Sequence, residues 1–494
     1  MILLYIFLFS LVLNCVSLQN ANPIVQINDG KLEGVWDTTS ENRRFAAFKG
    51  VPYANPPNGE YRFKDPRPVT KWSGVRNATV YGAPCLYLEG TLEQIFGDED
   101  CLFLNIFTPI LDSKAKLPVV VFIHGGDFMS GSGDLYNPVR LMNYDMIIIT
   151  LNYRLGPLGF FSTGDDVVAG NAGLKDQAFA LQWIQRNIKN FGGDPDSVTL
   201  TGHSTGSACV YYHYLSPWSH GTFHRGIAYS GSALAPWALD DYPVEKGRTL
   251  ANIVGCPYTT SRAMIQCLRS KPAADIANAQ LQMRDNEFQI YKIFQPVIES
   301  PKVHNPFLAE NPYRAAISGK MSKLPLMMTT TREEGLIPAA AYQAAPQLLP
   351  RLDERWVELA SYFLDYNRTL PKSRSAEVAK KIKDFYFSGE PISLDTFWPL
   401  VRVVTDRIYQ ADIGKLVQIH ANLARVPVYV YEYSFAGSYS ISNILSNSSV
   451  IYGAAHTDDI LHLFILYGIT SNSTGDLAMN KVMGDMLYSY ASTR

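Results

Sequence analysis

Residues 197–213, SVTLTGHSTGSACVYYH, place the tightest limit on how this chain can fold. The segment begins with apolar and β-branched residues that predict a buried strand, and it continues in a pattern that predicts a helix. Between the two stands GHSTG, residues 202–206, which is a G-x-S-x-G turn in the strand–turn–helix context that such a turn needs. Its glycines permit a tight, strained turn that holds the Ser204 hydroxyl out of the sheet, at the N–H end of the new helix. The segment therefore predicts a serine nucleophile.

Short apolar runs alternate with helical patterns through the middle of the chain. Residues 117–123 (LPVVVFI), 145–151 (DMIIITL) and 426–435 (VPVYVYEYSF) predict further buried strands. Residues 173–195 repeat apolar side chains at helical spacing until two glycines stop the pattern. This alternation predicts an α/β fold with a mostly parallel central sheet and helices on both faces. We expect residues 23–115, which are rich in turns, to form an irregular or antiparallel β extension of that sheet.

The N-terminus and the composition limit where the protein acts and what it binds. Residues 1–17, MILLYIFLFSLVLNCVS, predict a cleaved secretory signal peptide, with a signal anchor as the alternative because a basic start is missing. Residues 18–494 contain no long linker or repeat and predict a single domain, for which 47% hydrophobic residues supply a large core. No later segment has the ~20 apolar residues of a membrane helix. The net charge of -2 argues against a nucleic-acid partner.

The cysteines and the glycosylation sequons also fit a secreted protein. One of the six cysteines leaves with the signal peptide, and short intervals suggest the disulfides Cys85–Cys101 and Cys256–Cys267. Cys209 then remains as a free thiol in a helix. The N-x-S/T sequons lie at Asn77, Asn367, Asn447 and Asn472. Together these features predict a secreted, disulfide-bonded glycoprotein.

A serine nucleophile needs a base, and the base needs an orienting acid. With a G-x-S-x-G elbow, the acid and then the histidine follow the serine along the chain. His456 in GAAHTDDI is the best-placed base, because it follows a late strand and a glycine-containing turn. His462 falls inside the apolar run ILHLFIL, which predicts a core residue. The acid is expected after KLPLMMTTT, where the pattern does not choose between Glu333 and Glu334.

The turn HGGDF, residues 124–128, supplies the remaining group. It follows a predicted strand, and its glycines let the backbone come close to a ligand. In elbow hydrolases such a turn and the residue after the nucleophile, here Thr205, donate N–H groups to a developing oxyanion. Each such donor is commonly worth about 3–4 kcal/mol. Asp127 is unusual there, because it brings a negative charge to a site that stabilises one.

Several segments together resemble the type-B carboxylesterase/cholinesterase family of α/β-hydrolases. The resemblance runs from about residue 24 to the end and rests on FKGVPYANPPNGEYRF, EDCLFLNIFTP, VVVFIHGGDF, NYRLGPLGFF, GNAGLKDQAFALQWIQRNIKNFGGDP, VTLTGHSTGSA and GAAHTDDI. It implies an α/β-hydrolase fold and a serine esterase that acts on small-molecule carboxylic esters, and we expect neither a cofactor nor a metal. The family places the acid directly before a glycine, which favours Glu334, and it has the disulfide pairs that the short intervals suggest.

The resemblance also implies a role for each site residue. Ser204 attacks the ester carbonyl, His456 takes its proton, and Glu334 stabilises the resulting imidazolium. The oxyanion would be held by backbone N–H groups of a loop whose members are Gly125, Gly126 and Asp127, together with Thr205. Gly125 shapes this loop, and the other three donate.

Asp127 stands where the family has a third glycine. We weigh three outcomes for its carboxylate. It points into solvent, or it repels the oxyanion and slows ordinary ester turnover, or it orients a second water and speeds breakdown of an acyl- or phosphoryl-enzyme.

Another departure argues against a cholinesterase. The loop LYLEGTLEQIFGDED lacks the tryptophan that stacks on the ammonium group of cholinesterase substrates. His203 stands where cholinesterases have a glutamate, but this position varies among carboxylesterases and says little about activity. The sequence ends 38 residues after His456, whereas family members usually continue through another helix and a β segment, so the C-terminus reads as short. The alternatives are an adhesion-type relative and a slow-turnover binding protein for hydrophobic molecules. The complete triad favours the esterase.

Overall fold

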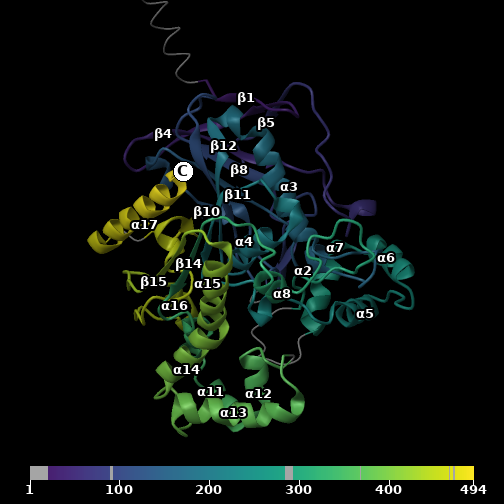
Figure 1. The fold of residues 1–494 in the computed structure, drawn as a ribbon, viewed down its shortest axis with the longest axis vertical. Helices are drawn as coiled ribbons and strands as arrows, with labels where there is room; N and C mark the ends of the chain where they lie inside the picture. The colour runs from purple at the N-terminus through teal and green to yellow at the C-terminus, as the bar shows by residue number, and fades with distance from the viewer. Residues whose placement is uncertain are drawn as a thin grey trace, which may run out of the picture.

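A large mixed sheet forms the centre of the molecule (Figure 1). The computed structural model describes residues 21–89, 93–283, 293–367, 369–466, 468–470 and 473–493. Within these residues the central sheet has nine strands in the order β15-β14-β13-β12-β9-β11-β8-β4-β3. In chain order they are β3 (Val35–Thr38), β4 (Arg44–Pro52), β8 (Phe103–Thr108), β9 (Leu117–Ile123), β11 (Ile147–Leu151), β12 (Gly193–His203), β13 (Arg225–Tyr229), β14 (Leu326–Thr331) and β15 (Val428–Tyr433). The predicted signal peptide and the sequon at Asn472 lie outside the described residues.

The strand directions follow the sequence pattern. From β11 through β9, β12, β13 and β14 to β15 all neighbours are parallel. β8, β4 and β3 extend the sheet in antiparallel fashion, which confirms the expectation for the N-terminal region. The remaining short strands pair outside this sheet: β1 (Ile24–Gln26), β2 (Lys31–Glu33), β5 (Val75–Asn77), β6 (Tyr87–Glu89), β7 (Gln94–Phe96), β10 (Tyr136–Asn137) and β16 (Ile465–Leu466).

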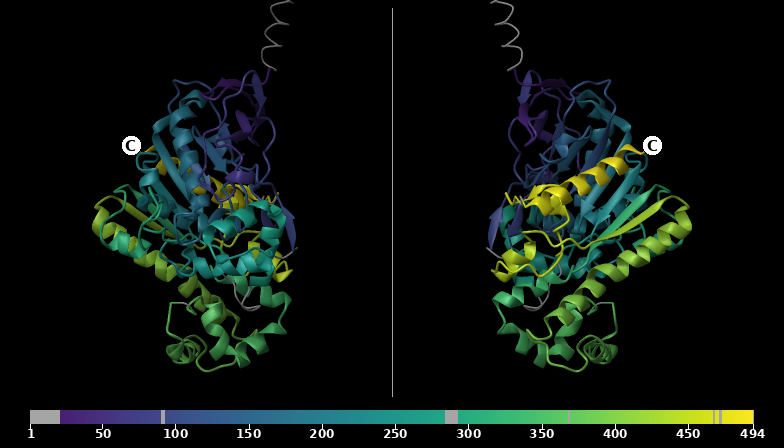
Figure 2. Two further views of the ribbon diagram at one scale, coloured as in Figure 1. Left: turned by 90° about the vertical axis from the view of Figure 1, so that its right-hand side faces the viewer. Right: turned by 90° about the vertical axis from the view of Figure 1, so that its left-hand side faces the viewer.

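Both faces of the sheet are buried, which explains the uninterrupted apolar run in β9. Val119 and Val121 pack into one core cluster, and the alternate residues Val120 and Phe122 pack into a second one. Because successive side chains of a strand point to opposite faces, each cluster covers one side of the sheet. α3 (Ala172–Asn187) and α4 (Thr205–Leu215) contribute to the first cluster. α17 (Thr474–Ser492) contributes to the second and lies across the sheet (Figure 2).

A helical lobe extends beyond the sheet (Figure 1). It is built from α11 (Leu348–Glu354), α12 (Trp356–Phe363), α13 (Lys372–Phe387) and α14 (Phe397–Val404). A π-helical turn, η8 (Thr405–Gln410), joins α14 to α15 (Ala411–Ala424), which runs back to the sheet. π-helical turns are rare in proteins, and those that occur are often found at functional sites. Tyr409 in this turn packs against the ring of His456, the candidate base.

Short helices and two disulfides complete the described chain. The helices are α2 (Gly156–Phe160), α5 (Pro243–Ile253), α6 (Ser261–Ser270), α7 (Ala273–Asn278), α8 (Pro312–Ile317), α9 (Leu336–Ala339), α10 (Ala341–Ala344) and α16 (Ile441–Ser446). Cys85 pairs with Cys101 and Cys256 with Cys267, as the sequence predicts. Cys209 is a buried free thiol in α4. None of the helices described here is both long enough and apolar enough to span a membrane.

Candidate active site

Ser204 sits on a sharp turn between β12 and α4. Its backbone has φ 59° and ψ -121°, a strained conformation that L-residues rarely adopt. The turn needs both glycines because neighbouring backbone comes too close for a side chain. A Cβ on Gly202 would lie 2.3 Å from the Gly206 carbonyl oxygen, and one on Gly206 would lie 2.2 Å from that of Ile123. The resulting elbow presents a partly exposed Ser204 at the N-terminus of α4.

Glu334 and His456 are in direct contact. The Nδ1 atom of His456 donates to Oε2 of the fully buried Glu334 over 2.6 Å. The other carboxylate oxygen accepts from the Thr331 N–H at 2.7 Å and the Thr330 hydroxyl at 2.9 Å. These bonds hold the carboxylate in one orientation. With Nδ1 engaged in this way, Nε2 of His456 is the nitrogen available as a base.

Glu333 has a different role from its neighbour. One oxygen of its carboxylate accepts from the Ala454 N–H at 2.8 Å, and its own N–H donates to the Ala454 carbonyl at 3.1 Å. It therefore anchors the backbone that leads to His456, while Glu334 holds the imidazole. Geometry thus separates the two glutamates that the residue pattern alone leaves equivalent.

Two aromatic rings pack against His456. The ring of His203, the residue before the nucleophile, lies 4.6 Å from it, and the ring of Tyr409 in η8 lies 4.7 Å from it. Burial and then the charge of His456 hold the pKa of His203 well below its usual value, so His203 stays neutral. Among the described atoms, Ser204 Oγ has no hydrogen bond to His456. Such bonds often tighten only when substrate binds.

The HGGDF turn follows β9 directly and lies against the elbow. A Cβ on Gly125 would lie 2.9 Å from the Cβ of Ser204, so this residue must be small. The Asp127 N–H donates to the Thr205 Oγ1 at 3.1 Å. Within the described part of the chain, the N–H groups of Gly126 and Thr205 have no acceptor. The predicted oxyanion donors therefore lie near Ser204, and the N–H of one of them, Asp127, is bound by the Thr205 hydroxyl.

Two further carboxylates, those of Asp458 and Asp459, lie on the loop that carries His456, and burial raises the pKa of Asp458 to about 7. Burial raises the pKa of Asp459 to about 7, the charge of Glu334 adds to this rise, and the charge of His456 opposes it. One oxygen of Asp459 accepts from the Ile460 N–H at 2.9 Å. The other is buried and has no hydrogen-bond partner among the described atoms. Asp458 and Asp459 therefore add two titratable carboxyl groups close to the Glu334–His456 pair.

The other buried histidines are held neutral. Burial lowers the pKa of His124 to about 4, against a hydrogen bond to the Gly125 carbonyl that raises it. Burial also lowers the pKa of His213 to about 3. His213 contacts Ser219 and Gln177 inside the fold. His462 is buried and contacts Asn480, so it lies in the core as its apolar surroundings predict.

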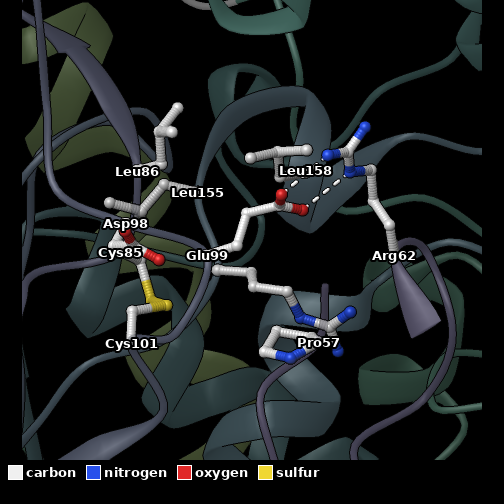
Figure 3. Close-up of a pocket in the computed structure, with 10 residues that line it drawn as sticks. Pro57, Arg62, Cys85, Leu86, Asp98, Glu99, Cys101, Leu155 and Leu158 are labelled. Carbon is white, nitrogen blue, oxygen red and sulfur yellow. Dashed lines mark hydrogen bonds and ion pairs between the residues drawn. A yellow bond between two sulfur atoms is a disulfide. The ribbon is translucent and has the colours of Figure 1, made fainter. Parts of the chain in front are cut away.

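A small pocket lies beside the Cys85–Cys101 disulfide, and the polar contacts in it serve the fold (Figure 3). Two guanidinium nitrogens of Arg62 donate hydrogen bonds of 2.7 Å to the two carboxylate oxygens of Glu99. The third nitrogen donates to backbone carbonyls, among them those of Leu268 and Lys271. Every guanidinium nitrogen is thus already bound within the protein. The lining contains none of the triad or oxyanion-loop residues.

Sequence reasoning missed several contributors to the site. Thr330 and Thr331 orient Glu334, and their position at the end of a strand next to the acid was the available signal. Tyr409 lies 47 residues before His456 in an unremarkable helical pattern, so nothing local pointed to it. The contact of His203 with His456 arises because the end of β12 meets a loop that lies 253 residues later in the sequence.

The sequons differ in accessibility. Asn77 and Asn447 are exposed, and Asn367 is half-buried. The Asn77 side-chain oxygen accepts hydrogen bonds from both the backbone and the hydroxyl of Thr79.

The geometry agrees with the comparisons to known proteins. The model of the carboxylesterase family matches residues 21–494. The chain belongs to the type-B carboxylesterase family. It is 39% identical to venom carboxylesterase-6 of Apis mellifera over 95% of this chain and 85% of the relative, and 38% identical to esterase FE4 of Myzus persicae over 95% and 84%.

A solved esterase structure confirms the fold. Juvenile hormone esterase from Manduca sexta, with OTFP covalently attached, matches 95% of this chain and 90% of its own, with a TM-score of 0.84 and 29% identity. The α/β-hydrolase fold expected from the sequence is therefore confirmed. The protein is a carboxylic-ester hydrolase of the serine esterase type.

Proposed function

We propose that this carboxylesterase is secreted and cleaves small-molecule carboxylic esters through a Ser204–His456–Glu334 triad and an acyl-enzyme. The observation that carries the proposal is the 2.6 Å contact between His456 and the buried Glu334, beside a strained elbow that presents Ser204. A serine, a histidine and a carboxylate in these roles form the general arrangement for acyl transfer.

In the first half-reaction Ser204 attacks the ester carbonyl carbon. His456 Nε2 takes the hydroxyl proton, and the Glu334 carboxylate stabilises the imidazolium that forms. The developing oxyanion accepts hydrogen bonds from the N–H groups of Gly126 and Thr205. When the tetrahedral intermediate collapses, His456 gives its proton to the alcohol oxygen, the alcohol leaves, and Ser204 remains acylated.

In the second half-reaction water replaces the alcohol. His456 removes a proton from this water, and the resulting oxygen attacks the acyl carbonyl. The same N–H groups hold the second oxyanion. Its collapse returns the proton to Ser204 and releases the carboxylic acid.

Secretion and glycosylation form part of the same proposal. They are supported by the apolar segment 1–17, by the disulfides Cys85–Cys101 and Cys256–Cys267, and by the exposed sequon asparagines Asn77 and Asn447. Loss of mass on treatment with an N-glycosidase, and recovery of the protein from culture medium, test this part. We also propose Asn367 and Asn472 as acceptors, on their sequons alone.

The catalytic test is labelling and turnover in one set of variants. We expect a fluorophosphonate to label the wild type and not Ser204→Ala. Glu334→Gln should lower kcat for p-nitrophenyl butyrate by roughly 10³- to 10⁴-fold, because it removes the charge that orients and stabilises the imidazolium. Glu333→Gln is the matched control: it keeps an acceptor oxygen for the Ala454 N–H, so kcat should change by less than about tenfold. A folded wild type that is not labelled would refute the triad.

The charge at Asp127 supports one competing function, a binding protein that turns esters over slowly. Steady-state hydrolysis of p-nitrophenyl acetate and butyrate separates the two. A burst of about one product per site, followed by almost no turnover, would favour sequestration over esterase action.

A further inference from the structure

The oxyanion loop has an unusual backbone. Gly126, Asp127 and Phe128 follow one another with φ of 105°, 68° and 61°. Glycine adopts such angles without cost, whereas Asp127 and especially the bulky Phe128 are strained. A strained segment keeps its shape only when its surroundings hold it, so the contacts of this loop determine where its N–H groups point.

One contact reaches the loop from the helix that begins at the nucleophile. The Asp127 N–H donates to the hydroxyl oxygen of Thr205 over 3.1 Å. Thr205 is the first residue of α4 and is buried, so its side chain has little freedom to move away. The bond ties the middle of the loop to the residue whose own N–H is an oxyanion donor.

A second contact closes the connection from the other end of the loop. The Tyr153 hydroxyl donates to the His124 carbonyl at 3.0 Å, and the two rings stack with 4.4 Å between their centroids. Burial raises the pKa of Tyr153 well above its usual value, so the phenol keeps the proton it donates. The Thr205 side chain also interacts with this phenol and partly offsets the rise in its pKa.

We propose that Thr205 and Tyr153 form a brace that sets the position of the oxyanion loop, with the Thr205 hydroxyl as its central link. Both are positioning residues through their side chains: they hold His124 and Asp127, and the Gly126 N–H between them is aimed at the substrate oxygen. The inference rests on the proposed serine-esterase function and adds to it a role for these two side chains.

The brace should affect the rate more than binding. Oxyanion donors work at 2.7–3.1 Å from the charge that forms in the transition state, and they act little on the ground-state carbonyl. A small displacement of the loop therefore lowers kcat with less effect on KM.

Thr205→Val tests the hydroxyl while keeping the branched shape. Activity is measured with p-nitrophenyl butyrate and divided by the number of sites titrated with a fluorophosphonate, so that misfolded protein does not count. We expect kcat per titrated site to fall roughly 10- to 100-fold, because ångström-scale misplacement of reacting groups has costs of this size. Thr205→Ser restores the hydroxyl and should recover most of the rate.

Thr201→Val is the matched control. Thr201 is a buried threonine of β12 whose hydroxyl donates to the Val121 carbonyl at 3.1 Å, without touching the oxyanion loop. We expect its kcat per titrated site to stay within about twofold of the wild type, because the lost bond costs stability and not alignment. An equal loss in Thr201→Val and Thr205→Val would overturn the proposal, as would a Thr205→Ser variant no better than Thr205→Val.

Tyr153→Phe provides the second line of evidence. If Tyr153 and Thr205 act through one brace, the double variant Thr205→Val/Tyr153→Phe loses little more than the worse single variant. Losses that multiply would overturn the brace, and so would a single Thr205→Val variant with wild-type kcat. A wild type that neither labels nor turns over would instead refute the proposed esterase, which keeps the two failures distinct.

Discussion

At the residue scale, Asp127 is the position where this site differs most from what an oxyanion loop needs. Asp and Asn tolerate left-handed backbone better than most residues, which is how the turn keeps its shape without a third glycine. The charge of Asp127 raises the pKa of both Tyr153 and Tyr409, although burial is the largest cause for each. Because Tyr409 packs on His456, this charge is felt within the catalytic centre.

We therefore expect Asp127→Gly to speed acylation by simple esters. A carboxylate ~4 Å from the oxyanion costs on the order of 4 kcal/mol at an effective dielectric near 20, and the cost falls with distance. We expect the acylation rate, measured as the burst of p-nitrophenol, to rise by about 3- to 100-fold. Asp127→Asn removes the charge at nearly constant size and should share most of the gain. An unchanged rate would mean that the carboxylate faces solvent, and a slower deacylation in Asp127→Gly would assign it to water activation.

At the element scale, the loop carrying His456 is held from three sides. Glu333 binds its backbone at Ala454, Glu334 binds the imidazole, and η8 brings Tyr409 against the ring. The same loop carries Asp459, whose second oxygen has no hydrogen-bond partner among the described atoms. The loop is thus rigid where the imidazole must be oriented, and it carries a carboxyl group whose charge the fold disfavours.

Asp459 should make the protein less stable as the pH rises toward neutrality. Its folded pKa of about 7 lies above the usual 3.8 of an aspartate, so the folded state binds this proton more tightly. The stabilisation is complete below the unfolded pKa and is lost as the pH rises through the folded one, at about 1.4 kcal/mol per pKa unit. We expect the Tm of Asp459→Asn to fall less between pH 5 and pH 8 than the Tm of the wild type. Asp395→Asn, at an exposed aspartate, should leave that fall unchanged, and an unchanged fall in Asp459→Asn would contradict the assignment.

At the scale of the whole molecule, the candidate site is formed on the central sheet and the layers that cover it, and more peripheral segments pack around them. The Cys256–Cys267 disulfide has a sequence separation of 11 and joins the segment after α5 to α6. Because α5 and α6 lie at the edge of the molecule (Figure 1), we expect the disulfide to act on the stability of this edge and not on the geometry at Ser204.

Removing this disulfide should therefore lower stability without slowing catalysis. We expect the double variant Cys256→Ala/Cys267→Ala to lose about 2–4 kcal/mol, because the unfolded chain regains the freedom that the closed loop denied it. Thermal unfolding measures the loss as a lower Tm. The kcat per titrated site should stay within about twofold of the wild type. An unchanged Tm, or a large fall in kcat, would contradict this separation.

Much of this protein could be predicted from its sequence, because the relevant signals are local. Apolar runs, helical spacing and a glycine-bounded serine occur in consecutive residues, and they identified β9, β11, β12 and β15, α3 and the elbow at Ser204, although not β13. Chain order and a glycine-containing turn also singled out His456, which lies in contact with the acid that the family resemblance favoured.

Only the tertiary structure decided how these parts meet. Glu334 and His456 are 122 residues apart, and Asp127 and Thr205 are 78 apart, so no short pattern records either contact. The same holds for Tyr409 on His456 and for Tyr153 beneath the oxyanion loop. Periodicity determines which face of an element is buried, whereas the partner across a contact depends on how separate loops converge at one edge of the folded sheet.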